Sequence, residues 1–154
     1  MSNLLMDGEQ MMRAQGPQAF AMEGWIDTAP FENLLGMVIE EAAQGRAVLR
    51  LPFKVKLAQG GGLLHGGAIT ALADTAVAMA IKSVLPEGTR FATTELTTRF
   101  VAPLQEGTLI ARAEVGSPQG RTFRGEAILN DEQEREIARF TSVFRVARGQ
   151  GFDE

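Results

Sequence analysis

The sequence centres on an apolar run over residues 68–81, which only two threonines and Asp74 interrupt. Residues 67 to about 84 predict one long helix, and Pro86 follows as its end. A helix that is apolar on nearly every side has to be buried. The run is also too short to span a bilayer. The chain must therefore fold so that its other elements enclose this helix.

The segments on both sides of the helix alternate in the manner of strands. Residues 34–53 predict two strands around a turn at 42–45. Four more strands are expected after the helix, over residues 91–101, 107–115, 121–129 and 136–146. Short turns between consecutive strands favour antiparallel pairing. The simplest architecture is therefore α+β, with an antiparallel sheet curled around the helix.

The length of 154 residues predicts one domain with a substantial core. We expect it to span residues 29–148, with an N-terminal extension over 1–28 that packs on it and a disordered tail over 149–154. A net charge of −4 gives no reason to expect nucleic-acid binding. Without cysteine, the chain has no disulfide, thiol nucleophile or cysteine metal site. The N-terminus shows no export signal, so we expect a cytoplasmic protein without membrane attachment.

Asp74 is the only acidic residue between Glu41 and Glu87. Aspartate is a poor residue inside a helix, and a buried carboxylate without a partner is costly unless its pKa rises. A structural explanation is a local hydrogen bond, for example to Thr70 one turn earlier. A functional explanation is a catalytic carboxylate, and Asp74 by itself leaves the two evenly balanced.

The helix is preceded by "LLHGGA", which offers no Ser, Thr, Asp or Asn at the expected cap position. The N–H groups of the first turn therefore have no obvious side-chain partner. Such donors beside glycine suit an anion, or a carbonyl oxygen that becomes anionic during a reaction. The alternative is that the glycines only let helix and strand pack tightly. His65 is the only histidine, and no second His, Cys or nearby acid suggests a metal site.

Gly66 and Asp74 are eight residues apart, which corresponds to roughly 12 Å along a helix. One reacting carbonyl cannot lie beside both groups of a single chain. If both act on one substrate, the helix start comes from one subunit and the carboxylate from another. This hypothesis requires a homodimer with two equivalent sites.

The stretch "LLHGGAITALADTA" resembles the HGG…LAD signature of hotdog-fold acyl-CoA thioesterases, in particular the phenylacetate-pathway (PaaI-like) branch. The likeness continues through "TTELTTRFVAPLQEGTLIARAEV" and "GRTFRGEAILNDEQEREIARFTSVFRV", and covers roughly residues 31–146. The resemblance implies the hotdog fold, an antiparallel sheet wrapped around a long central helix. It also implies a homodimer, expected to associate further as a dimer of dimers.

The resemblance further implies hydrolysis of an acyl- or aryl-acyl-CoA thioester to free acid and coenzyme A. The backbone N–H of Gly66 matches the family's oxyanion donor, and Asp74 matches its nucleophile or general base. Thr93 matches a hydroxyl residue that helps to orient water. Gln59 stands where the family often has Asn, and it keeps the amide with one more methylene. His65 matches a histidine with a positioning or capping role.

Two further residues are expected to bind substrate by the same resemblance. Gly67 belongs to the helix start, and Arg121 falls where relatives place contacts to the phosphates of coenzyme A. No metal or redox cofactor is implied, since coenzyme A enters as part of the substrate.

Two other functions compete with thioester hydrolysis. A non-catalytic acyl-CoA-binding module would have no need of a costly carboxylate at Asp74. A hotdog dehydratase or hydratase would carry a paired Asp/His arrangement or a His–Phe–Pro motif, and neither is present. The acyl group itself is not identified by the sequence.

Overall fold

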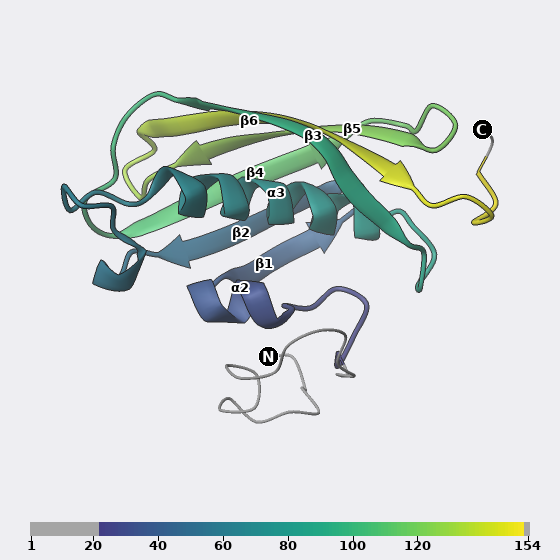
Figure 1. Ribbon diagram of the computed structural model, residues 1–154, viewed down its shortest axis with the longest axis horizontal. Coiled ribbons are helices and arrows are strands. Elements are labelled where there is room, and N and C mark those ends of the chain that lie inside the picture. The colour runs from purple at the N-terminus through teal and green to yellow at the C-terminus, as the bar shows by residue number, and fades with distance from the viewer. Residues whose placement is uncertain (1–21, 153–154) are drawn as a thin grey trace.

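The computed structural model describes residues 22–152. Its elements follow one another as α2 (Pro30–Leu35), β1 (Val38–Ala43), β2 (Arg46–Pro52), the short 3-10 helix η1 (Val55–Leu57), α3 (Gly66–Lys82), β3 (Phe91–Phe100), β4 (Thr108–Val115), β5 (Thr122–Asn130) and β6 (Glu136–Val146) (Figure 1). The predicted order of two strands, one long helix and four strands is confirmed.

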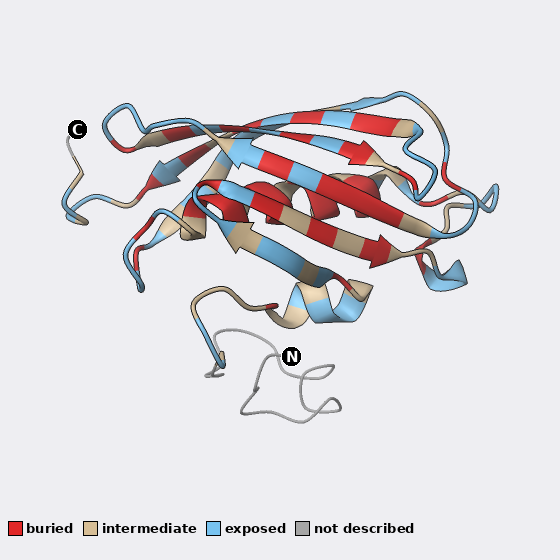
Figure 2. Ribbon diagram, turned by 180° about the vertical axis from the view of Figure 1, so that it is seen from behind, coloured by how far each residue is buried: buried red, intermediate tan, exposed pale blue. Residues whose placement is uncertain are grey.

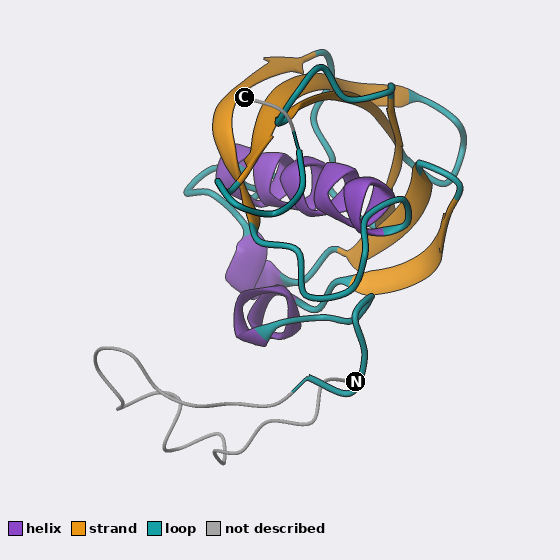
Figure 3. Ribbon diagram, turned by 90° about the vertical axis from the view of Figure 1, so that its right-hand side faces the viewer, coloured by secondary structure: helices purple, strands orange, loops and turns teal. Residues whose placement is uncertain are grey.

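The strands form one six-stranded sheet in the order β1-β2-β4-β5-β6-β3. Every neighbouring pair is antiparallel. The sheet curls around α3, as Figure 3 shows from the side. This confirms the α+β hotdog architecture. Strand β3 directly follows α3 in the chain but lies at one edge of the sheet, where it pairs with β6.

The core lies between α3 and the concave face of the sheet. On β2 the side chains of Ala47, Leu49 and Leu51 are buried, and the residues between them are less so, which gives the alternating bands of Figure 2. Helix and sheet approach closely at β5, because a Cβ atom at Gly125 would overlap a methyl group of Val77. Glycine is therefore needed at this position so that the helix can pack closely against the sheet.

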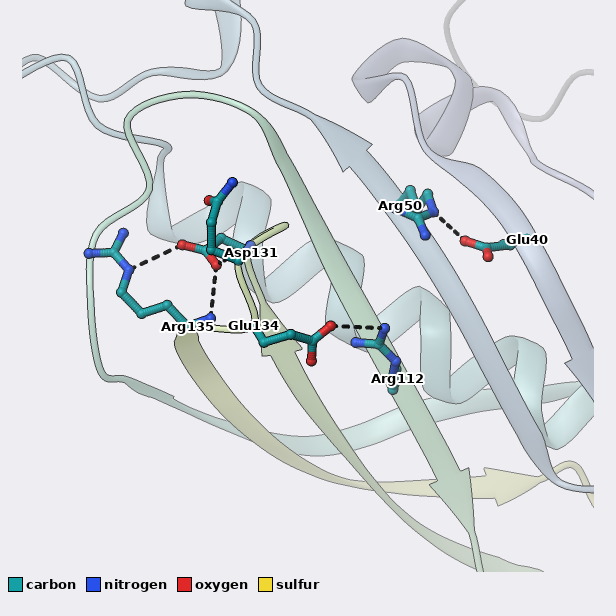
Figure 4. Close-up of polar contacts among 7 residues, drawn as sticks. Glu40, Arg50, Arg112, Asp131, Glu134 and Arg135 are labelled. Atoms are coloured by element: carbon teal, nitrogen blue, oxygen red, sulfur yellow. Dashed lines mark hydrogen bonds and ion pairs between the residues drawn. The ribbon is translucent and has the colours of Figure 1, made fainter.

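The convex face of the sheet is charged and bears ion pairs (Figure 4). Arg112 lies 3.8 Å from Glu134, and Arg135 lies 3.2 Å from Asp131. The exposed Arg112–Glu134 pair contributes little to stability, whereas the Asp131 side chain is nearly buried in the turn after β5. Asp131 has a further role, because its Oδ1 accepts the backbone N–H groups that close the turn between β5 and β6. The N–H of Arg135 is the main reason why the pKa of Asp131 is lowered.

The first strand is shorter than the sequence predicts, because residues 34 and 35 belong to α2. Pro30 occupies the first turn of that helix, where its missing N–H is harmless. Gly36 ends the helix in the left-handed conformation, with φ of 86°. Only then does β1 begin.

Both ends of the described chain pack on the domain. The indole N–H of Trp25 donates a 2.9 Å hydrogen bond to the carbonyl of Lys82, which ties this part of the N-terminal segment to the end of α3. The predicted extent of the N-terminal extension stays a prediction. The structure describes the tail as far as residue 152, and the predicted disorder of 149–154 stays a prediction. The ring of Phe152 packs edge-on against Phe123, with 6.3 Å between centroids, because this aromatic side chain gains burial. Residues 1–21 and 153–154 lie outside the described residues.

Across residues 22–152, no helix is both long and apolar enough to cross a membrane.

Candidate active site

Asp74 lies in the middle of α3 and is half-buried. Its Oδ1 accepts a 2.8 Å hydrogen bond from the hydroxyl of Thr93, near the start of β3. Burial raises the pKa of the Asp74 carboxyl, the hydrogen bond from Thr93 opposes that rise, and the charge of Glu32 adds to it. The net rise makes Asp74 a stronger base than an exposed aspartate. The structure thus brings Asp74 and Thr93 into direct contact, and the role of Thr93 in orienting water stays a prediction.

The structural explanation through Thr70 is wrong. The Thr70 hydroxyl lies 2.8 Å from that of Thr98, and Asp74 is held by Thr93 instead. Thr93 and Thr98 are an odd number of positions apart, so a regular strand would point them to opposite faces. The register of β3 against β6 shifts between Thr93 and Glu95, and this bulge turns both threonines toward α3.

The start of α3 is capped by a side chain, contrary to the expectation from the sequence. His65 is the N-cap residue, and its Nδ1 accepts a 2.8 Å hydrogen bond from the N–H of Gly67. The imidazole thus caps the helix, and a role of His65 in catalysis stays a prediction. A Cβ atom at Gly67 would lie 2.9 Å from this Nδ1, so the cap leaves no space for a side chain there. The N–H of Gly67 is engaged by the cap, and its role in substrate binding stays a prediction.

The N–H of Gly66 is placed differently. Ala68 and Ile69 donate their N–H groups to the carbonyl of His65, and no acceptor for the Gly66 N–H occurs among residues 22–152. It lies at the positive end of the helix, where a partial negative charge is stabilised. A Cβ atom at Gly66 would lie 3.1 Å from Cζ of Phe100, so this aromatic ring covers one side of the glycine.

A pocket of about 390 Å³ opens beside Gly66. Its walls are mostly apolar and consist of Gln59, Leu63, Leu64, Gly66, Ile69, Phe100, Val101, Ala102 and Pro103. Gln59 thus shares a pocket with the proposed oxyanion donor. Its Oε1 accepts the N–H of Gly61 in its own loop. A contact between Gln59 and a thioester or water stays a prediction.

Arg121 is built into the fold. It is only 8% exposed, and its Nη1 donates a 2.9 Å hydrogen bond to the carbonyl of Val146 at the end of β6. The observed main-chain contact gives Arg121 a structural role, and its contact with phosphates of coenzyme A stays a prediction.

The predicted residues form two separate groups within one chain. Gly66 and Gln59 line the pocket at the start of α3, together with Phe100, which the sequence did not single out. Asp74, further along the helix, and Thr93 on β3 are not part of that pocket. Gly66 and Asp74 belong to one continuous helix, so their axial separation is roughly 12 Å, as expected. Within one chain, the open N–H of Gly66 therefore has no carboxylate of Asp74 beside it.

Comparison with known proteins identifies clear relatives. A sequence profile described as the thioesterase superfamily matches residues 61–138. A candidate esterase of Halobacterium salinarum is 34% identical over 102 residues, which are 63% of this chain and 67% of that protein. The matched range includes Gly66, Asp74 and Thr93, but it does not include Gln59 or α2.

Two solved structures have the same architecture. A thioesterase family protein from Silicibacter pomeroyi has 29% identity and a TM-score of 0.72, with 79% of this chain and 91% of that one covered. The PaaI protein from the phenylacetic acid degradation operon of E. coli has 26% identity and a TM-score of 0.72, with coverage of 79% and 87%.

Proposed function

This chain belongs to the thioesterase superfamily, and from that premise we propose that it hydrolyses acyl-CoA or aryl-acyl-CoA thioesters to free acid and coenzyme A. The observation that carries the proposal is the position of Asp74. Asp74 is a half-buried carboxylate on α3 with a raised pKa, and it accepts a hydrogen bond from Thr93 of β3. The first N–H of the same helix, that of Gly66, has no acceptor among residues 22–152. Perturbed carboxylates of this kind cluster at functional sites.

The thioester carbonyl would accept a hydrogen bond from the N–H of Gly66, and that bond strengthens as the oxygen becomes negative. Loss of one such donor costs about 10²–10³-fold in turnover in other hydrolases. Asp74 would either attack the carbonyl carbon or remove a proton from the attacking water. Thr93 holds the carboxylate in place for either route.

We also propose that two protomers share each site. Strand β3 is an edge strand with exposed apolar side chains, 40% for Leu96 and 56% for Phe100. Antiparallel pairing of two β3 strands about a two-fold axis at Leu96 and Thr97 would bring Thr93 opposite the partner's Phe100. Since Thr93 holds Asp74 and Phe100 covers Gly66, the base of one protomer would then face the donor of the other.

The test is a hydrolysis screen with aryl-, short-, medium- and long-chain acyl-CoA substrates, read as release of free thiol. The parent protein is expected to hydrolyse at least one class, and Asp74→Asn, run beside it, is expected to be inactive toward that class. Binding of acyl-CoA without turnover by the parent would overturn the proposal in favour of a non-catalytic acyl-CoA-binding module.

A further inference from the structure

Two pockets flank the start of α3. Gly66 lines the pocket of about 390 Å³ described above, whereas His65 and Gly67 line another of about 350 Å³, and no residue lines both. We call the second one the α2 pocket, because α2 and η1 supply much of its wall. Its other lining residues are Phe31, Leu35, Lys56, Leu57, Ala58 and Ala68. An acyl-CoA thioester also has two arms, since the acyl group and coenzyme A extend from opposite sides of its carbonyl carbon.

The two pockets differ in charge. No charged side chain lines the pocket beside Gly66. The α2 pocket is lined by one cation, Lys56, and by no carboxylate. Two other cavities of the molecule are instead lined by several carboxylates, among them Glu114 and Glu126. In a chain with a net charge of −4, the α2 pocket is therefore a place of local positive charge that favours an anionic ligand.

The positive charge belongs to η1 and the residue before it. Lys54 and Lys56 stand on either side of Val55, and all three side chains are exposed, Val55 to 85%. The Lys56 ammonium donates a 3.2 Å hydrogen bond to the carbonyl of Leu34 in α2, and an ammonium has three N–H donors. The Lys54 ammonium has no partner among the residues that the structure describes. Both cations can therefore bind further acceptors.

This segment is joined directly to the residue that precedes Gly66. The N–H of His65 donates a 2.9 Å hydrogen bond to the carbonyl of Leu57, the last residue of η1. Lys56 is the neighbour of Leu57 in the chain, and it lines the α2 pocket together with His65. A ligand in this pocket that contacts Lys56 therefore lies beside the helix start, where the thioester carbonyl would bind.

We propose that the α2 pocket receives the coenzyme A arm of the substrate, with Lys54 and Lys56 as contacts for its phosphates, and that the uncharged pocket beside Gly66 receives the acyl group. The assignment rests on the proposed thioesterase function. The apolar walls of the α2 pocket suit the methylene groups of the pantetheine arm, and the two ammonium groups suit phosphate oxygens. Arg121, which the resemblance assigns to the phosphates, is 8% exposed, whereas both lysines are exposed.

The test measures binding of coenzyme A and of pantetheine, which lacks the phosphates, by titration calorimetry. In the double variant Lys54→Gln, Lys56→Gln, the Kd for coenzyme A should rise on the order of tenfold, because two exposed charge contacts are lost. Its salt dependence should weaken, and the Kd for pantetheine should stay parental. Arg124→Gln is the matched control, since Arg124 is an exposed cation on β5, and it should change neither value. Phe31→Ala should weaken binding of both probes by the same factor.

Parental affinity of the double lysine variant for coenzyme A would overturn the phosphate contacts, and parental affinity of Phe31→Ala for pantetheine would overturn the position of the arm. Hydrolysis assays separate this proposal from the proposed function. In the double variant, KM for an acyl-CoA should rise, while kcat and the KM for the matching acyl-pantetheine stay constant. Lysine-dependent binding of coenzyme A without any hydrolysis by the parent would contradict the proposed function and support the site. Hydrolysis with an unchanged KM in the double variant would contradict the site and support the function.

Discussion

The hydroxyl of Thr93 donates a 2.8 Å hydrogen bond to Oδ1 of Asp74, and this bond ties the middle of α3 to the edge strand β3. A second bond, between Thr70 and Thr98, ties the same helix to the same strand. Only the first of these involves a group that titrates. The Thr70–Thr98 bond therefore serves as a structural control for the Thr93–Asp74 bond, whose effect on the carboxylate can be measured against it.

Replacement of Asp74 by Asn removes the carboxylate and keeps the size of the side chain. We expect kcat to fall about 10²–10⁴-fold, because positioned acid–base groups typically contribute that much. Affinity for a non-hydrolysable acyl-CoA analogue should stay close to that of the parent, which titration calorimetry can measure. Near-parental turnover in folded Asp74→Asn would show that the residue is structural.

Asp74→Asn is expected to lower turnover but to raise the stability of the folded protein at neutral pH. The pKa of Asp74 is raised in the folded state above its ordinary value of 3.8, so the folded protein binds more protons between the two values. Stability therefore falls as pH rises through this window. We expect Asp74→Asn to melt at a higher temperature than the parent at pH 7, and the advantage to vanish below about pH 4. Melting curves at several pH values measure this, and a less stable variant at pH 7 would contradict it.

Thr93→Val and Thr98→Val form a matched pair on β3. Both remove a hydroxyl that bonds to α3, but only Thr93 contacts Asp74. The bond from Thr93 lowers the pKa of Asp74, so its loss should move the acid limb of kcat/KM to higher pH. The Thr98 variant should keep the parental profile. Equal shifts in both variants would mean that the position of β3, and not the hydrogen bond from Thr93, sets the pKa of Asp74.

Gly66→Pro removes the proposed oxyanion donor with little demand on the backbone. Gly66 is the first residue of α3, where proline is well tolerated, and His65 before it has φ of −61° and ψ of 134°, which suits a following proline. Gly66→Ala is the control, because it adds a Cβ atom near Phe100 and keeps the N–H. We expect kcat of the proline variant to be about 10²–10³-fold below that of the alanine variant. Equal rates would exclude Gly66 as the donor.

Shared sites can be tested by mixing two inactive proteins. In a heterodimer of Asp74→Asn and Gly66→Pro, one site combines the intact Gly66 of one chain with the intact Asp74 of the other. Random exchange should restore roughly a quarter of the parental activity, because half of the dimers are mixed and each has one functional site. Subunit exchange is followed by mass spectrometry. No recovery after complete exchange would place both groups in sites within single chains.

Local periodicity was sufficient to predict most of the fold. The alternation of Ala47, Leu49 and Leu51 predicted which face of β2 is buried, and the apolar run predicted the enclosed helix. The short helix α2 was missed although Pro30 and Gly36 are its ordinary start and stop signals. The apolar residues around it had been assigned to the following strand.

The candidate site was harder to predict because its geometry depends on contacts distant in sequence. The bulge after Thr93 arises from the register of β3 against β6, and no local pattern marks it. His65 is an unusual N-cap residue, so the motif seemed to lack a cap.

The position of β3 at the sheet edge also has a consequence for biosynthesis. Its neighbour in the sheet is β6, which leaves the ribosome after the other five strands of this sheet. At about 5–20 residues per second, roughly 2 to 9 s separate the synthesis of Phe100 from that of Val146. Throughout this interval α3 and β3 lack the strand that closes the sheet over them. The nascent chain thus exposes the apolar helix α3 during this interval, and is expected to need chaperone protection until β6 emerges.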